Sequence, residues 1–318
     1  MRFYFAPMEG VTSYIYRGLH ARLFPGVAKY FSPFIAPDGS GKYKAGGQRD
    51  LLPENNAGLS LVPQILCGRP EAFLAAARAM AALGYGEVNL NAGCPSATVV
   101  PKHKGAGLLA DTRALEVFLN EVFSHCPTAV SVKTRLGLDS AEEFPAILEV
   151  YNKFPISELI IHARDRAGMY RSAPDLPAFL RALGESRCPV CYNGDLFSPA
   201  EFGAIREAAP GLETVMAGRG AAANPALIRQ LSGGAPLGAE ELRQFLEELA
   251  AALYASGLGE RYTLARLKEL WYYCSSMFPG CEREMKRIYK SRELCDYSAA
   301  VAALFASGGF DPSAKFGG

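Results

Sequence analysis

The chain has 318 residues, of which 49% are hydrophobic and 20% are charged, so its composition excludes the disordered and strongly charged classes. The net charge is +1, and bulk electrostatics therefore cannot drive binding to a polyanion, which would need a local patch. The longest uncharged runs have 14 residues, fewer than the roughly 18 that span a membrane. We expect a cytoplasmic protein without a membrane partner, whose eight cysteines stay reduced.

Short apolar runs alternate with helical patterns along the first three quarters of the chain. The predicted strands cover residues 2–6, 27–31, 61–66, 87–91, 129–133, 158–161, 190–193 and 214–217. The predicted helices between them cover 71–83, 112–123, 141–153 and 199–208. Eight strands alternating with helices over about 230 residues predict an α/β fold of the (β/α)8 TIM-barrel type. A doubly wound open sheet is the alternative.

The character of the sequence changes after the Gly- and Pro-rich segment 232–238, beyond which no strand pattern occurs. From residue 239 the apolar residues follow helical spacing, as Leu242, Phe245, Leu246 and Leu249 do. Residues 262–273, 282–291 and 297–305 have the same character. We therefore predict two domains, a barrel over 1–237 and a small helical bundle over 238–318.

Polar and glycine residues follow seven of the eight predicted strands. Because barrel enzymes carry their chemistry at the C-terminal ends of the strands, these residues should meet at one mouth. Gly218 and Arg219 precede a helical run expected to begin near Asn224, and such a turn can hold a phosphate, although it is more often a simple connection. The other strand-end residues are Pro7, Met8, Glu9, Gln64, Asn91, Lys133, Arg135, His162, Arg164, Asn193, Gly194 and Asp195.

Cys94 lies past the end of a predicted strand, where a core cysteine has little reason to be. A free cysteine has a pKa of about 8.5, so the thiol form dominates at neutral pH and can donate a proton as a general acid. Cys188 and Cys191 have the spacing of a redox or zinc pair, but Cys191 falls inside a predicted strand and no second pair exists. We predict a structural role for both and no metal site.

The strand-end motifs together resemble those of the tRNA-dihydrouridine synthases, which are flavin-dependent reductases of uridine in tRNA. Each motif alone is weak, but their order, nearly one per strand end, is specific, and the resemblance covers the predicted barrel. The motifs are Ala-Pro-Met-Glu-Gly-Val-Thr (6–12), Pro-Gln-Ile (63–65), Asn-Leu-Asn-Ala-Gly-Cys-Pro-Ser (89–96), Lys-Gly-Ala-Gly (104–107), Val-Lys-Thr-Arg-Leu-Gly (132–137), Ile-His-Ala-Arg (161–164), Tyr-Asn-Gly-Asp (192–195) and Ala-Gly-Arg-Gly (217–220).

The resemblance implies an activity, its cofactors and the residues that hold them. NADPH or NADH would reduce FMN, hydride would pass from the flavin to C6 of uracil, and Cys94 would protonate C5. Asn91, Arg135 and Arg164 would lie near the uracil or the flavin edge. Asp165 stands where the family commonly has threonine, which leaves the modified uridine open. FMN would be held by Pro7, Met8, Glu9, Gln64, Lys133, His162, Asn193, Gly194 and Asp195, with Gly218 and Arg219 at its phosphate.

The predicted helical tail carries a candidate tRNA-binding face. Arg283, Lys286, Arg287 and Lys290 follow helical spacing and form one basic stripe, although a solvated charged face is an equally good explanation from the residues alone. Two alternatives to a tRNA-modifying enzyme stay open. One is an FMN-dependent barrel that reduces a free pyrimidine or another small molecule, and the other is a tRNA-binding protein without catalysis. The oligomeric state is open, with a monomer plausible.

Overall fold

The computed structural model describes residues 1–38 and 42–316, which fall into two compact units. The first unit contains residues 1–7, 28–195 and 205–216, and the second contains 8–27, 196–204 and the chain from 217 onward. The second unit thus includes two segments that precede the helical tail in the sequence. The division into domains at residue 237 stays a prediction.

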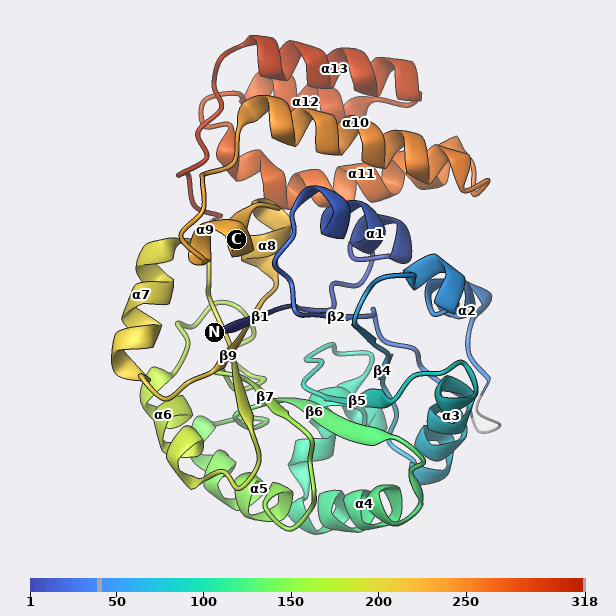
Figure 1. The fold of residues 1–318 in the computed structure, drawn as a ribbon, viewed down its shortest axis with the longest axis vertical. Helices are drawn as coiled ribbons and strands as arrows, with labels where there is room; N and C mark the ends of the chain where they lie inside the picture. Colours follow the sequence, from blue (N-terminus) through green and yellow to red (C-terminus); the bar gives the residue numbers. More distant parts are fainter. Residues whose placement is uncertain (39–41, 317–318) are drawn as a thin grey trace. The chain divides into compact units, whose positions relative to one another are not determined.

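The first unit is built on parallel strands that close into a barrel (Figure 1). Its strand order is β3-β2-β1-β9-β8-β7-β6-β5-β4, and β3 and β4 are consecutive pieces of one predicted strand on either side of Pro63. Because β3 pairs with β2 while β4 pairs with β5, the ring closes and the open sheet is excluded. The predicted TIM barrel is confirmed. The strands are β1 (Arg2–Phe5), β2 (Lys29–Phe31), β3 (Leu61–Val62), β4 (Gln64–Ile65), β5 (Glu87–Ala92), β6 (Ala129–Arg135), β7 (Leu159–His162), β8 (Val190–Asn193) and β9 (Thr214–Ala217).

Helices α3 to α6 lie outside the ring of strands, as Figure 1 shows. They are α3 (Pro70–Ala82), α4 (Thr112–His125), α5 (Phe144–Tyr151) and α6 (Leu176–Glu185), and α6 was not among the predicted helices. The first unit also has α2 (Ala45–Asp50) and short 3-10 turns at Pro53–Asn56, Val100–Lys102, Gly105–Ala110 and Ala141–Glu143. Helix α7 (Pro199–Ala208) is divided between the two units.

Strand alternation decides which side chains fill the barrel. Buried residues from six strands, including Tyr4, Phe31, Ile160 and Cys191, form one cluster, which they can do only inside the ring. On β7 Ile160 therefore points inward, and two residues later so does His162. The parallel register then extends this inward face to the neighbouring strands, where Lys133 pairs with Ile160 and Asn91 pairs with Lys133.

The second unit consists of helices. They are α1 (Tyr14–Leu23), α8 (Arg219–Ala223), α9 (Leu227–Leu231), α10 (Ala239–Ala255), α11 (Glu260–Cys274), α12 (Glu282–Lys290) and α13 (Leu294–Ala306), with a 3-10 turn at Ser275–Met277. The predicted helical tail is confirmed in α10 to α13, whose core includes the fully buried Trp271. Within residues 1–38 and 42–316, no helix is long and apolar enough to cross a membrane.

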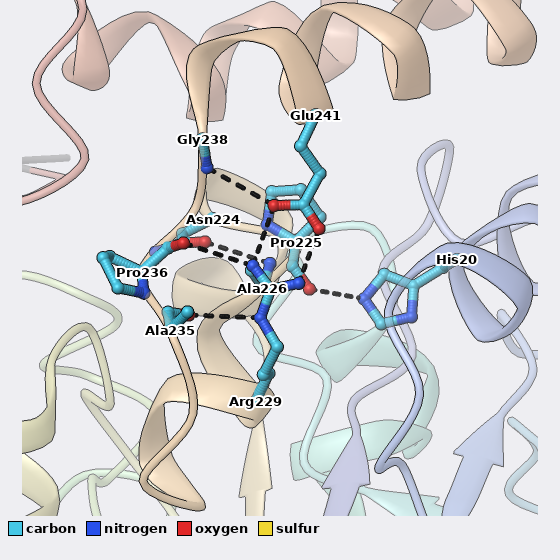
Figure 2. Close-up of polar contacts among 9 residues, drawn as sticks. All are labelled: His20, Asn224, Pro225, Ala226, Arg229, Ala235, Pro236, Gly238 and Glu241. Carbon is cyan, nitrogen blue, oxygen red and sulfur yellow. Dashed lines mark hydrogen bonds and ion pairs between the residues drawn. The ribbon is translucent and has the colours of Figure 1, made fainter.

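Arg229 fastens the segment between α9 and α10, as Figure 2 shows. Its guanidinium group forms a bidentate ion pair with Glu241 in the first turn of α10 and donates to the carbonyls of Ala235 and Pro236. The Glu241 carboxylate also accepts the N–H of Gly238, which satisfies one of the free donors at the start of α10. Hydrogen bonds from Arg229 and to Glu241 therefore fix the Gly- and Pro-rich segment at Ala235, Pro236 and Gly238.

A buried histidine lies beside this segment (Figure 2). His20 on α1 is fully buried, and its Nε2 lies 2.9 Å from the carbonyl oxygen of Pro225. Because a carbonyl only accepts, Nε2 carries the proton. Burial lowers the pKa of His20 to about 4, against about 6.5 for a histidine in an unfolded chain.

This shift predicts acid lability of the second unit. The folded form disfavours the charged ring, so the stability that neutral His20 contributes is present above pH 6.5 and is lost as the pH falls from 6.5 toward 4. Between pH 7.5 and pH 5 we expect a loss of about 2 kcal/mol that His20→Gln does not show. Urea unfolding followed by the fluorescence of Trp271, the single tryptophan, measures it. Equal losses in both proteins would contradict the assignment.

Candidate active site

A chain of buried amide side chains crosses the inward face of β4, β5 and β6. The N–H groups of Gly93 and Cys94 donate to Asn91 Oδ1 over 3.1 and 2.9 Å. Asn91 Nδ2 then donates to Gln64 Oε1 at 2.8 Å, and Gln64 Nε2 donates to Asn89 Oδ1 at 2.9 Å. The chain ends where Asn89 Nδ2 donates to Ser131 Oγ over 2.9 Å. Its direction is fixed, because backbone N–H groups can only donate.

Cys94 sits on a loop shaped by this chain and by the Gly-rich motif 104–107. Its thiol is free and partly exposed, and its carbonyl accepts the N–H of Ala106 at 3.0 Å. Gly105 has a φ of +56°, and a Cβ there would lie 2.8 Å from both the Cβ and the carbonyl oxygen of Cys94. Only glycine fits this approach. The loop is therefore positioned from both sides while the thiol keeps access to solvent.

Lys133 on β6 is the cationic group of the barrel interior. Its Nζ donates to Asn193 Oδ1 at 2.8 Å, and Asn193 Nδ2 donates to the carbonyl of Met216 at 2.9 Å, which fixes the orientation of that amide. Burial, together with the positive charge of Arg135, lowers the pKa of Lys133 to about 7. An anionic group beside Lys133 would restore its charge, and the site thus favours an anionic or electron-rich ligand.

Arg135 lies at the end of β6 and is almost fully buried. Its Nε donates to the carbonyl of Gly93 at 3.0 Å, and Nη1 donates to the carbonyls of Asp165 and Met169 at 2.7 and 2.9 Å. Its guanidinium also lies 5.3 Å from the centre of the Tyr170 ring. Arg135 therefore ties the Cys94 loop to the segment 165–170, in which Met169 has a φ of +54°.

Arg164 and His162, which are buried, form a second group with the partly exposed Asp195. Arg164 makes a bidentate ion pair with Asp195, donates through Nε to the carbonyl of Ser172 at 2.6 Å, and places Nη1 3.2 Å from His162 Nε2. Gly194, between Asn193 and Asp195, has no room for a side chain, because a Cβ would lie 2.3 Å from Tyr192 Oη.

Met8, Glu9, Gly218 and Arg219 belong to the second unit, whereas Pro7 belongs to the first. The loop after Met8 turns at Gly10, whose φ is +79° and whose carbonyl accepts from Arg266 Nη1 at 3.0 Å. Arg219 is itself the first residue of α8, so the prediction that a helix begins only near Asn224 is wrong. Its guanidinium lies 5.6 Å from the centre of the Phe197 ring.

The first unit brings together most of the residues predicted for its strand ends. Gln64 contacts Asn91, Lys133 contacts Asn193, and His162 and Asp195 both contact Arg164. The predictions missed Asn89 and Ser131, although both alternate with apolar residues in the inward phase of β5 and β6. Cys188 and Cys191 are free, and residues 1–38 and 42–316 hold no cluster of three or more metal-ligating side chains.

Comparison with known proteins adds a family and a fold. A family model described as dihydrouridine synthase (Dus) matches residues 4–303. The tRNA-dihydrouridine synthase B of Pseudomonas putida is 29% identical over 94% of this chain and 90% of its own length. The tRNA-dihydrouridine(16) synthase of Cupriavidus necator is 28% identical over 95% of this chain and 99% of its own. These two relatives differ in their names, so they do not single out one uridine.

Solved structures that resemble this chain share its barrel fold. Morphinone reductase matches with a TM-score of 0.52 and 14% identity, over 74% of this chain and 86% of that one. The old yellow enzyme homologue from Zymomonas mobilis matches with a TM-score of 0.52 and 12% identity, over 74% of this chain and 90% of that one. At these identities the likeness concerns the fold alone.

The amide chain predicts an unusually costly substitution. Asn91→Leu removes the partner of three buried or partly buried polar groups, which are the N–H groups of Gly93 and Cys94 and the side-chain oxygen of Gln64. Each unpaired group costs about 1 kcal/mol or more, so we expect the free energy of unfolding to fall by about 3 kcal/mol. Urea unfolding followed by circular dichroism measures it. The control is Asn55→Leu, which removes one exposed hydrogen bond and should cost below about 1 kcal/mol. Similar losses in the two variants would contradict the argument.

Proposed function

Because the chain belongs to the dihydrouridine synthase family and is therefore a flavin-dependent oxidoreductase, we propose that it reduces specific uridines in tRNA to 5,6-dihydrouridine. The cofactor would be FMN and the reductant NADPH or NADH. The observation that carries the proposal is Cys94, a free and partly exposed thiol on a loop fixed by Asn91 and Gly105. A tRNA substrate also agrees with a cytoplasmic location.

In this proposal Cys94 Sγ donates the proton that C5 of uracil receives. A thiol carries a proton that it can donate, and a general acid must come within hydrogen-bond reach of the atom that it protonates. The peptide group between Gly93 and Cys94 is held twice, because its N–H donates to Asn91 and its carbonyl accepts from Arg135. The carbonyl of Cys94, in the next peptide group, accepts from the N–H of Ala106. The chain thus supplies a positioned acid, which contributes typically 10²- to 10⁴-fold to a rate.

The residues present fit a bound flavin. Lys133 has lost hydration and keeps further donors beside the one that it gives to Asn193, which suits an electron-rich ring. When bound, FMN would supply the hydride for C6 of uracil. By the family resemblance, Gly218 and Arg219 would take the phosphate. The remaining contacts would come from Pro7, Met8, Glu9, Gln64, Lys133, His162, Asn193, Gly194 and Asp195.

Helix α12 supports RNA as the substrate rather than a free pyrimidine. Met285 and Ile288 are buried on one face, while Arg283, Lys286, Arg287 and Lys290 are all exposed. None of these four cations makes an ion pair with another described residue. A free pyrimidine base has no phosphates for such a row of cations to bind, whereas a folded RNA has many that the row can neutralise. An unpaired or extruded base then reaches the acid.

Cys94→Ala tests the reaction. With protein reduced anaerobically by NADPH, we expect tRNA lacking dihydrouridine to reoxidise the flavin, and Cys94→Ala to slow dihydrouridine formation by about 10²-fold or more without loss of flavin or tRNA binding. Flavin absorbance and quantification of the modified base measure this. The control is Cys126→Ala, another partly exposed free thiol of the same unit.

Each other outcome favours a named alternative. Equal reoxidation by free uridine would favour the small-molecule reductase. A flavin-free protein that still binds tRNA would favour a binding protein without catalysis. Unchanged dihydrouridine formation in Cys94→Ala would remove Cys94 as the acid.

The basic stripe of α12 makes a second prediction. Substitution of Arg283, Lys286, Arg287 and Lys290 by glutamate should weaken tRNA binding. It should also reduce the slope of log affinity against log salt concentration by up to about three, because each lost phosphate contact reduces that slope by about 0.7 to 0.9. Flavin content should not change. Filter binding over a range of salt concentrations measures both quantities.

A matched control separates this face from net charge. Arg78, Arg113, Arg181 and Arg187 are four exposed arginines of the first unit, and their reversal changes the total charge by the same amount. We expect a smaller effect on the salt slope. Equal effects of the two quadruple variants would remove α12 from the proposal.

A further inference from the structure

Arg164 is held more tightly than a ligand-binding arginine needs to be. Its side chain is 1% exposed, and it is fixed by the bidentate pair with Asp195 and by the bond from Nε to the carbonyl of Ser172. Because the guanidinium is planar and its donors form a rigid fork, these bonds also fix where Nη1 lies.

The fixed guanidinium determines the protonation of its neighbour His162. Arg164 Nη1 lies 3.2 Å from His162 Nε2 in the geometry of a hydrogen bond. A guanidinium has donors and no acceptor, so His162 Nε2 must carry a lone pair. The proton of the ring therefore sits on Nδ1. A doubly protonated ring would set one N–H against another and add a second cation beside Arg164.

We propose that Arg164 is a positioning residue that holds His162 in its neutral Nδ1–H form, so that His162 serves the site as a hydrogen-bond donor through Nδ1 and not as an acid. The tautomer follows from the contacts alone, whereas its use in the reaction rests on the proposed function. With His162 committed to this form, the proton for the substrate has to come from another group, in agreement with the role given to Cys94.

The other histidines provide internal references. His20 has the opposite form, since its Nε2 donates to the carbonyl of Pro225. His103 and His125 are both exposed, and Nδ1 of His125 lies 3.1 Å from the carbonyl oxygen of Glu121. The chain has four histidines in total, so single substitutions can assign every ring.

The first experiment records long-range ¹H–¹⁵N correlations of the holoenzyme labelled with ¹⁵N-histidine at pH 8.5, which is above the reference pKa of histidine. We expect His162 to show a protonated Nδ1 and an unprotonated Nε2, the reverse of His20. Arg164→Met, which removes every donor, should change His162 to the Nε2–H form, and Arg164→Lys, which keeps a donor-only group, should restore Nδ1–H. A His162 ring protonated at Nε2 in the unsubstituted protein would overturn the proposal even if Arg164→Met does not fold.

The second experiment tests the use of the tautomer. The amide nitrogen of asparagine takes roughly the place of histidine Nδ1, and that of glutamine takes roughly the place of Nε2. We expect His162→Asn to retain bound flavin better than His162→Gln, by at least about threefold in the flavin dissociation constant. The reverse order would overturn the donor role. A protein without flavin would refute the proposed cofactor while the histidine spectrum still decides the tautomer.

Discussion

Two hydrogen bonds, from the N–H groups of Gly93 and Cys94 to the side-chain oxygen of Asn91, govern the interior of the first unit. They fix which end of the Asn91 amide faces the Cys94 loop, and that choice passes through Gln64 and Asn89 to Ser131. A buried amide that faced the wrong way would leave its donors and acceptors unpaired at 1–3 kcal/mol each. The position of the thiol and the orientation of three amides are therefore one constraint.

The need to pair buried donors and acceptors also explains what the arginines at the strand ends do. Family resemblance assigns Arg135 and Arg164 to the neighbourhood of the substrate, yet both side chains are enclosed and bonded to this chain's own carbonyls and to Asp195. A guanidinium can satisfy several backbone carbonyls at once in fixed directions, which a lysine cannot do. These two residues thus set the loops around Cys94 and His162, and the flexible, less encumbered cation of the interior is Lys133.

The sequence predicts an element well where the buried residues of that element are apolar and follow the expected spacing. Strands β8 and β9 are bounded as predicted, because the buried run of β8 ends at the polar Asn193 and that of β9 is followed by Gly218. Helix α1 was missed since its buried face includes Arg17 and His20, which no hydrophobic pattern would place inside. Helix α6 was missed because prolines precede and enter it. Pro177 lies in the first turn, where its missing N–H costs nothing, and Asp175 caps the helix through Ala178.

For the candidate site, the sequence predicts which side chains take part but not how they pair with one another. Residue types and their order along the strands predict which side chains belong to it, since parallel strands bring their carboxyl ends together. The pairings do not follow from the sequence, because they depend on side-chain direction. Nothing in the motif Ile-His-Ala-Arg says that Arg164 faces back toward His162, and nothing in Asn-Leu-Asn says that Asn89 continues the chain from Gln64.

Lys133 shows why such a site is prepared for a ligand. Its pKa of about 7 means that, near neutral pH, this ammonium is close to the point at which it loses its proton. The cause is lost hydration and the charge of Arg135, and Asn193 provides a neutral acceptor that offsets only part of it. An electron-rich group next to Nζ favours the charged form and raises the pKa again. Binding of such a group would therefore be linked to proton uptake by Lys133, and the ligand and the proton would favour one another.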